Sequence, residues 1–225
     1  MLAKGHMSER YYYIETDGMV YLVEQAGWWI LPHLTEEIPF PFEVHESMIV
    51  AGREVLYCEP MLDYHPREWH HKDEIPGKEN VDPLVRQAVH HTLPRVVAEA
   101  VIRKQDQLLL VKPLRGFNAG QWTLPGGFVS YGEAPAQSVA REVGEEVGAP
   151  CRVGKLVGVE TFLGKKSFYT WHMFFYEVEL LGEEFHPAPD EIEEVRWFPF
   201  AEAIQALQGP KRQRIEELLS SRKSS

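Results

Sequence analysis

Cysteine is scarce in this sequence, and its scarcity excludes a stabilising disulfide framework. Only two cysteines, Cys58 and Cys151, occur among the 225 residues. Two thiols also cannot supply a four-cysteine zinc site. No signal peptide is recognisable near the start of the chain. The expectation is therefore a cytoplasmic protein, since reduced thiols are typical of that compartment.

Long hydrophobic runs and an excess of positive charge are also absent. No apolar run approaches the ~20 residues that a membrane-spanning helix needs, so no membrane partner is expected. The net charge of −11 disfavours broad nucleic-acid binding, which requires a cationic surface. There are no internal repeats and no low-complexity segments. A hydrophobic content of 44% is ample for a globular core.

What the sequence does have is a concentration of acidic residues between Gly127 and Ala149. If residues 135–147 form a helix, the spacing places Glu142, Glu145 and Glu146 on one face. Like charges three and four residues apart destabilise a helix, unless a bound cation becomes the largest local charge. The pattern predicts a divalent-cation site, and a solvated acidic helix is the alternative.

The neighbouring residues fit such a site. Carboxylates on one rigid face suit Mg²⁺, which is typically held by one or two carboxylates together with substrate phosphates. Mn²⁺ fits the same ligands. Arg141 lies one helical turn before Glu145 and is expected to hold it in place. Gly148 suits the left-handed position that ends a helix.

These residues together resemble the Nudix box. The box reads Gly, five residues, Glu, seven residues, Arg-Glu, an aliphatic residue, any residue, Glu-Glu, any residue, Gly and an aliphatic residue. Every fixed position is filled here, and only Ala149 is smaller than the usual aliphatic residue. The resemblance implies that Glu142 and Glu146 bind the metal directly, and that Glu145 binds it directly or through water. It implies structural roles for Gly127, Glu133, Arg141 and Gly148, with the Gly127 carbonyl as a further metal ligand.

The resemblance also implies a reaction. It is Mg²⁺-dependent hydrolysis of the diphosphate bond in a nucleoside diphosphate linked to another moiety. The run Leu124–Val129 is similar to that of ADP-ribose pyrophosphatases, which favours ADP-ribose or a nucleotide sugar as substrate. However, Gly164 and Lys165 stand where that group usually has a proline. NADH, a dinucleoside polyphosphate and an oxidised nucleoside triphosphate are the alternatives. An NADH pyrophosphatase also carries an extra N-terminal domain, but its zinc-binding cysteines are missing here.

A function of another class is a nucleotide-sensing, Nudix-like regulator without catalysis. Such regulators usually have a degraded box and an attached DNA-binding domain. Here the box is complete and no basic recognition helix is visible. The comparison therefore favours an enzyme, whose partner is a nucleotide-derived small molecule rather than a nucleic acid.

Further site residues are expected outside the box. Glu191 lies in an acidic segment before a terminal aromatic strand and is expected to be a fourth carboxylate, either as a metal ligand or as the base for the attacking water. The alternative is a solvated turn in which Glu193 or Glu194 points inward. Arg115, Phe117 and Trp122 are the expected substrate contacts.

The fold class expected is α+β, with five segments. Residues 1–7 resemble a tag or cloning remnant. Residues 8–60 read as a small β-rich domain, with hairpin turns at Asp17-Gly18 and Ala51-Gly52. Residues 61–94 read as a His- and Pro-rich connector that ends in a linker helix. Residues 95–208 resemble the Nudix domain, an α/β/α sandwich with a mixed sheet, and residues 209–225 form a C-terminal helix and tail.

The first β-rich domain contains more aromatic side chains than a unit of this size readily buries. It is therefore expected to mediate a homodimer or to cover the substrate site.

Overall fold

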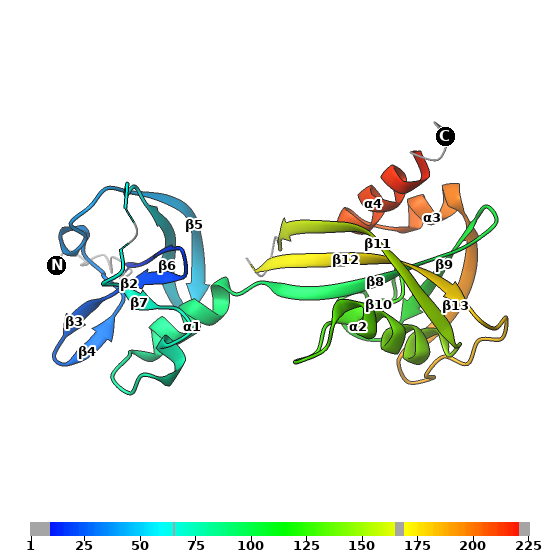
Figure 1. Cartoon of the computed structure of the whole chain (residues 1–225), viewed down its shortest axis with the longest axis horizontal. Helices are drawn as coiled ribbons and strands as arrows, with labels where there is room; N and C mark the ends of the chain where they lie inside the picture. Colours follow the sequence, from blue (N-terminus) through cyan, green and yellow to red (C-terminus); the bar gives the residue numbers. More distant parts are fainter. Residues whose placement is uncertain (1–9, 65, 165–168, 221–225) are drawn as a thin grey trace, which may run out of the picture. The chain divides into compact units, whose positions relative to one another are not determined.

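The computed structural model describes residues 10–64, 66–164 and 169–220. The chain divides into two compact units, Met1–Leu93 and Pro94–Ser225, whose ribbons are drawn in Figure 1. The expected cloning remnant at residues 1–7 lies outside the described residues, as do His65, Lys165 and the last part of the expected tail. In the described ranges, no helix is both long enough and apolar enough to cross a membrane.

The first unit is built on a five-stranded sheet with the order β5-β6-β1-β2-β7. Its strands are β1 (Arg10–Thr16), β2 (Met19–Tyr21), β5 (Phe42–Val50), β6 (Arg53–Pro60) and β7 (His70–His71); β3 (Val23–Gln25) and β4 (Trp28–Ile30) form a separate pair. Both predicted hairpins are confirmed, because β1 pairs with β2 and β5 pairs with β6 in antiparallel fashion. At the first turn, Asp17 and Gly18 have φ angles of 49° and 73°, as this type of tight hairpin requires.

The segment from residue 61 to residue 93 is part of this first unit. β7 pairs with β2, and the one-turn helices η1 (Thr35–Glu37) and η2 (Ile75–Gly77) complete the loops. Ile75 is fully buried. The predicted linker helix is α1 (Pro83–Thr92), and the Asp82 side chain caps it by accepting a hydrogen bond from the Leu84 N–H at 2.7 Å. The expected irregular connector is thus largely folded onto this unit, because Ile75, Val81 and one face of α1 are buried.

The second unit contains a six-stranded mixed sheet. Its strands are β8 (Arg95–Lys104), β9 (Gln107–Pro113), β10 (Gly126–Phe128), β11 (Cys151–Leu163), β12 (Thr170–Leu180) and β13 (Ile192–Pro199). The order is β11-β12-β8-β9-β13, and β10 pairs with β8. β8 and β12 run parallel, whereas the other pairs are antiparallel.

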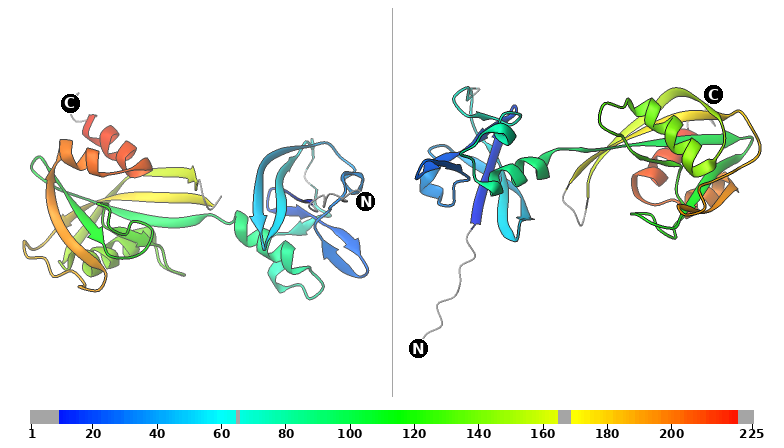
Figure 2. Two further views of the ribbon diagram at one scale, coloured as in Figure 1. Left: turned by 180° about the vertical axis from the view of Figure 1, so that it is seen from behind. Right: turned by 90° about the horizontal axis from the view of Figure 1, so that it is seen from below.

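Helices cover this sheet on both faces, as Figure 2 shows. One face packs against α2 (Pro135–Glu142) and the helical turn η3 (Val143–Val147) through Ala98, Ala100 and Ile102 of β8. The other face packs against α3 (Phe200–Ala206) and α4 (Gly209–Ser220) through Val97 and Val101. This is the expected α/β/α sandwich with a mixed sheet, and the alternation along β8 explains it, since successive strand side chains point to opposite faces. The C-terminal helix, which lies beyond the expected domain boundary at residue 208, packs on this sandwich as α4.

The helix that carries the acidic residues is not α-helical throughout. It is α-helical up to Glu142 and then continues as a π-helical turn over Val143–Val147. The Gly148 N–H accordingly donates to the carbonyl of Val143, five residues earlier, at 3.2 Å. Single π-turns within a helix are frequent at functional sites.

Candidate active site

Two glycines allow the backbone of β10 to approach the helix that bears the acids. A Cβ atom on Gly127 would lie 2.7 Å from Cδ of Glu142, a distance that real side chains do not reach. A Cβ atom on Gly126 would lie 2.8 Å from Cα of Glu99 on the neighbouring strand. Gly126 also donates its N–H to Oε2 of Glu146 at 2.8 Å. The loop therefore holds two box acids against its own backbone, which requires residues without side chains.

Arg141 joins the loop to the acidic face. Its Nε and Nη2 atoms donate to the two carboxylate oxygens of Glu133 at 3.0 and 3.1 Å. Its Nη1 atom donates to Glu142 at 2.7 Å and to Glu145 at 3.2 Å. Nη2 also reaches the carbonyl of Phe128 at 3.1 Å. One guanidinium thus compensates three of the four box acids, and the paired geometry with Glu133 fixes its orientation.

The pKa values of the box acids shift in two directions. Hydrogen bonds from Arg141 and from the Ser130 backbone lower the pKa of Glu133. By contrast, burial raises the pKa of Glu142, against the opposing effect of Arg141. Burial likewise raises the pKa of Glu146 to about 8, with repulsion from Glu142 and Glu99 adding to it. Buried acids that repel one another are typical of sites that receive a cation or move a proton.

Glu99 and Lys211 join this cluster, and sequence reasoning missed both. Glu99 lies on β8 and is only 3% exposed, and its Oε1 atom lies 2.7 Å from Nζ of Lys211 on α4. Lys211 also donates to Oγ1 of Thr123 at 2.7 Å. The available signal for Glu99 was a single acid inside the apolar run Val96–Ile102. The sequence pattern of α4 gave no signal for Lys211, which is one of several charged residues on that helix.

The donor atoms fit a hard divalent cation, because all of them are carboxylate or carbonyl oxygens. No three His, Cys, Asp or Glu side chains in the described residues already form a ligand group. Instead, the Glu142 and Glu145 carboxylates are turned toward Arg141. Oε2 of Glu99 is buried and has no hydrogen-bond partner among the described residues. An unsatisfied carboxylate oxygen beside two further acids is the feature of this cluster that a cation would relieve.

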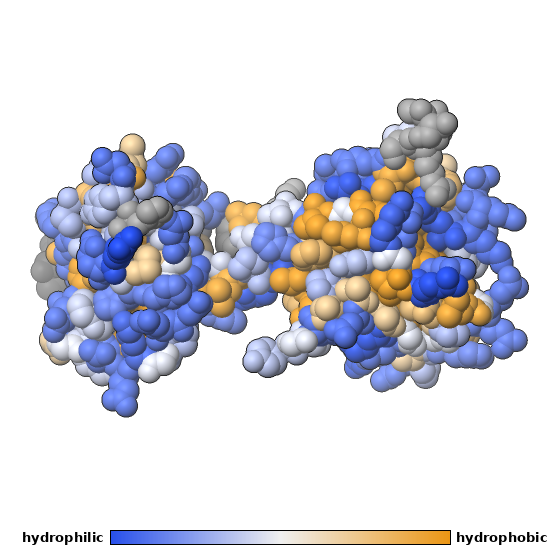
Figure 3. All heavy atoms as spheres, viewed as in Figure 1, coloured by the Kyte–Doolittle hydropathy of each residue, from blue (hydrophilic) through white to orange (hydrophobic). Residues whose placement is uncertain are grey.

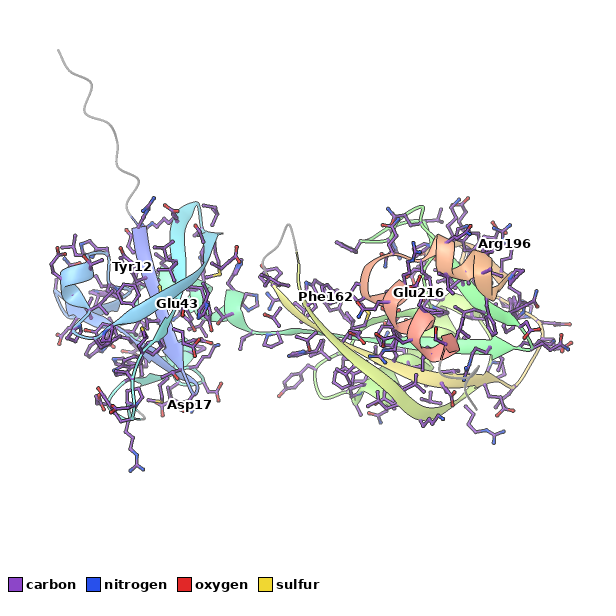
Figure 4. The ribbon with its side chains drawn as sticks, turned by 90° about the horizontal axis from the view of Figure 1, so that it is seen from above. Tyr12, Asp17, Glu43, Phe162, Arg196 and Glu216 are labelled. Atoms are coloured by element: carbon purple, nitrogen blue, oxygen red, sulfur yellow. The ribbon has the colours of Figure 1, made fainter. Side chains whose placement is uncertain are left out.

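The four expected residues outside the box lie in different surroundings. Glu191 forms an ion pair with Arg115, at 2.5 Å, and Asp190 lies 3.7 Å from the same guanidinium. Phe117 is 96% exposed. Trp122 packs edge-on against Phe198, with ring centroids 4.8 Å apart, and Arg196, labelled in Figure 4, lies over its ring. Trp122 is thus packed against the core on the α3–α4 side, whereas Phe117 is free to contact a ligand.

A second group of aromatic side chains lies next to the glycine loop. Phe128 directly follows Gly127 and is 58% exposed. Its ring centroid lies 5.5 Å from that of Trp171 on β12. Trp171 in turn stacks on Phe162 of β11, labelled in Figure 4, with an interplanar angle of 6°. The strand pairing that unites these three residues could not be read from the sequence.

Comparison with known proteins places these features in a family. Residues 92–219 match the model described as the NUDIX domain. The NAD-capped RNA hydrolase NudC of Stutzerimonas stutzeri (strain A1501) is 34% identical over 124 residues, which cover 54% of this chain and 43% of that protein. The ADP-ribose pyrophosphatase of Methanocaldococcus jannaschii is 39% identical over 66 residues, covering 29% of this chain and 39% of that protein. The chain therefore spans less than half the length of these two curated relatives.

A solved structure gives the same result for the fold. The NUDIX hydrolase from Nitrosomonas europaea superposes with a TM-score of 0.52 at 25% identity, covering 57% of this chain and 90% of that one. Residues 92–219, which the NUDIX model matches, contain all six strands of the second sheet and every residue of the acidic cluster. Because the NUDIX model covers more than half of the chain, the chain belongs to the Nudix family.

Proposed function

We propose that this protein hydrolyses the diphosphate bond of a nucleoside diphosphate linked to another moiety, in a reaction that depends on Mg²⁺. The observation that carries the proposal is the placement of Glu142 and Glu146 against the Gly126-Gly127 backbone. Both acids are held in place, and burial raises the pKa of each despite the neighbouring cations Arg141 and Lys211. Such a site gains stability when it receives a cation together with a polyanionic substrate.

Glu142, Glu145 and Glu146 would hold the metal, with the Gly127 carbonyl as a further ligand. When bound, a divalent cation neutralises charge on the diphosphate oxygens and acidifies water. Mg²⁺ is the expected ion because every donor is oxygen, and Mn²⁺ is the alternative.

The chain's own residues orient these groups. Arg141 holds Glu133 and the Phe128 carbonyl, and this keeps the glycine loop on the helix. The Gly126 N–H fixes one oxygen of Glu146, so the other oxygen is free to accept a ligand or a proton. Glu191 is proposed as a further base or ligand, for which it must leave its ion pair with Arg115.

A nucleotide substrate is supported by the aromatic cluster beside the glycine loop. An exposed ring such as Phe128 offers a flat apolar surface on which a base stacks. ADP-ribose or a nucleotide sugar is favoured, in keeping with the similarity to an ADP-ribose pyrophosphatase. NADH, dinucleoside polyphosphates and oxidised nucleoside triphosphates are the alternatives. The similarity to an NAD-capped RNA hydrolase adds capped RNA to the substrates worth testing.

The test is a substrate panel with the purified full chain. ADP-ribose, UDP-glucose, NADH, a dinucleoside polyphosphate, 8-oxo-dGTP and NAD-capped RNA are incubated with Mg²⁺, and products are separated by chromatography. Cleavage between the two phosphorus atoms is expected for at least one of them, and Glu146→Gln should abolish most turnover. Nucleotide binding without cleavage would favour the sensing regulator. Near-normal turnover by Glu146→Gln at saturating Mg²⁺ would contradict the proposed site.

A further inference from the structure

Glu99 occupies an unusual position for a charged residue. It lies in the middle of β8, between Val97 and Val101 on the face that packs against α3 and α4. Its side chain is 3% exposed. Moving an ionised carboxylate out of water costs several kcal/mol unless partners compensate it. Glu99 therefore needs an explanation that apolar packing does not give.

Lys211 supplies half of that explanation. Its Nζ atom lies 2.7 Å from Oε1 of Glu99, and the lysine side chain is itself only 12% exposed. Thr123 accepts a second hydrogen bond from the same ammonium group. This ion pair anchors α4 to the sheet and satisfies one oxygen of Glu99.

The second oxygen lies against the glycine loop. Gly126 pairs with Glu99 in the β10–β8 register, and a Cβ atom on Gly126 would lie 3.0 Å from Oε2 of Glu99. The N–H of the same Gly126 holds Glu146. Oε2 has no hydrogen-bond partner among the described residues, although it lies where the glycine loop and the acidic helix meet. A purely structural ion pair accounts for Oε1 but leaves Oε2 buried and unsatisfied.

We propose that Glu99 is a further carboxylate of the divalent-cation site, contributed by β8, with Oε2 as its donor atom. This rests on the proposed function and extends it beyond the box. Lys211 holds the opposite oxygen, so that Oε2 faces Glu142 and Glu146. The cation site is therefore built from β8 and β10 as well as from the acidic helix, and α4 takes part in it through Lys211.

The experiment measures Mn²⁺ affinity of the metal-free full chain from the signal of free Mn²⁺ in electron paramagnetic resonance. Glu99→Gln removes the charge at constant shape, and Glu99→Asp keeps a negative charge on β8 but shortens the side chain by one methylene group. Glu160→Gln is the matched control, because the Glu160–Arg214 ion pair also joins α4 to the sheet but involves none of the box acids. Either Glu99 variant should weaken Mn²⁺ binding about tenfold or more, and Glu160→Gln should stay within about twofold.

Two results would overturn the inference. Mn²⁺ affinity within about twofold of wild type in a folded Glu99 variant would reduce Glu99 to a structural role. Equal losses in the Glu99 and Glu160 variants would show that only the docking of α4 matters. If Glu99→Gln does not fold, Glu99→Asp decides alone. A wild-type chain that binds no Mn²⁺ would contradict the proposed function as well, which distinguishes the two failures.

Discussion

At the scale of single residues, Glu146 should make the metal-free protein sensitive to pH. Its pKa is raised from 4.5 to about 8, first by burial and then by its acidic neighbours. A carboxyl group that binds its proton more tightly in the folded state stabilises the fold at low pH. That contribution is complete below about pH 4.5 and is lost as the pH rises through about 8.

We therefore expect the melting temperature in EDTA to fall between pH 6 and pH 9, and this decrease to be smaller in Glu146→Gln. At pH 9 the variant should melt roughly 5 °C or more above wild type. Differential scanning fluorimetry across the pH range measures both. Glu145→Gln, at an exposed position of the same helix, is the control and should keep the wild-type profile. Parallel profiles for wild type and Glu146→Gln would contradict the electrostatic account.

Variants of Glu191 and of its ion-pair partner Arg115 can test whether Glu191 acts as a general base or as a metal ligand. If Glu191 is a general base, Glu191→Gln should lower kcat by about 10²–10⁴-fold, and if it is a ligand the Mg²⁺ requirement should rise too. Arg115→Ala releases Glu191 from its ion pair and should not reduce kcat comparably. Steady-state kinetics over a range of Mg²⁺ concentrations separates these cases. A change below about threefold in Glu191→Gln would place the residue on the solvated surface.

The box acids were predictable because their spacing on one helix is itself the signal. Glu99 was not, because its role depends on Lys211, which lies far away in the sequence and meets it only through the docking of α4. Phe128 and Trp171 were missed for a related reason, since only strand pairing brings them together. Trp122 was expected to contact the substrate, but its ring packs against Phe198. The sequence could not separate these two roles, because a tryptophan near the box is equally suited to both.

At the scale of elements, the end of the acidic helix depends on Gly148. Its φ angle is 69°, and a Cβ atom would lie 2.6 Å from Cα of His186. Gly148→Ala should therefore destabilise the fold by about 2 kcal/mol or more. Gly144→Ala is a matched control in the same π-helical turn, because a Cβ atom there meets nothing within 4 Å, and it should be neutral or stabilising.

Urea unfolding of the two glycine variants provides the measurement. A similar free energy of unfolding for both would mean that the chain relaxes around residue 148. The π-turn itself was not predictable, since the helix was expected to be uniformly α-helical over 135–147. The bond from Gly148 to Val143 reflects how the helix must end against the loop at His186, and that contact is tertiary.

At the scale of the whole molecule, the sandwich and the β-rich first unit could be predicted, but not the allocation of the segments between them. Residues 61–94 were read as a connector because they are polar, yet Ile75 and Val81 are fully buried. The aromatic density of the first unit also has an internal explanation. Tyr21, Phe40 and Trp69 pack on one another. These three rings therefore make their aromatic contacts within the first unit itself.

The second unit offers another surface for the proposed homodimer. β11 is at one end of the sheet, and its Leu156, Val159 and Leu163 are 42–48% exposed. Figure 3 shows apolar side chains gathered over this part of the second unit. We expect the full chain to be a dimer, and light scattering after size exclusion is the measurement. A monomer after deletion of residues 1–88 would assign the interface to the first unit, whereas a monomeric Val159→Lys variant would assign it to β11. A monomeric full chain would contradict the expectation.

The ion pair between β8 and α4 also bears on chains that lack the last helix. Glu99 is translated early in the second unit and Lys211 late, so a partly synthesised chain carries an acid in its apolar face with no counter-cation. Docking of the last helix removes that penalty. A chain that ends before α4 carries Glu99 without this counter-cation, and we expect its second unit to be less stable than that of the full chain.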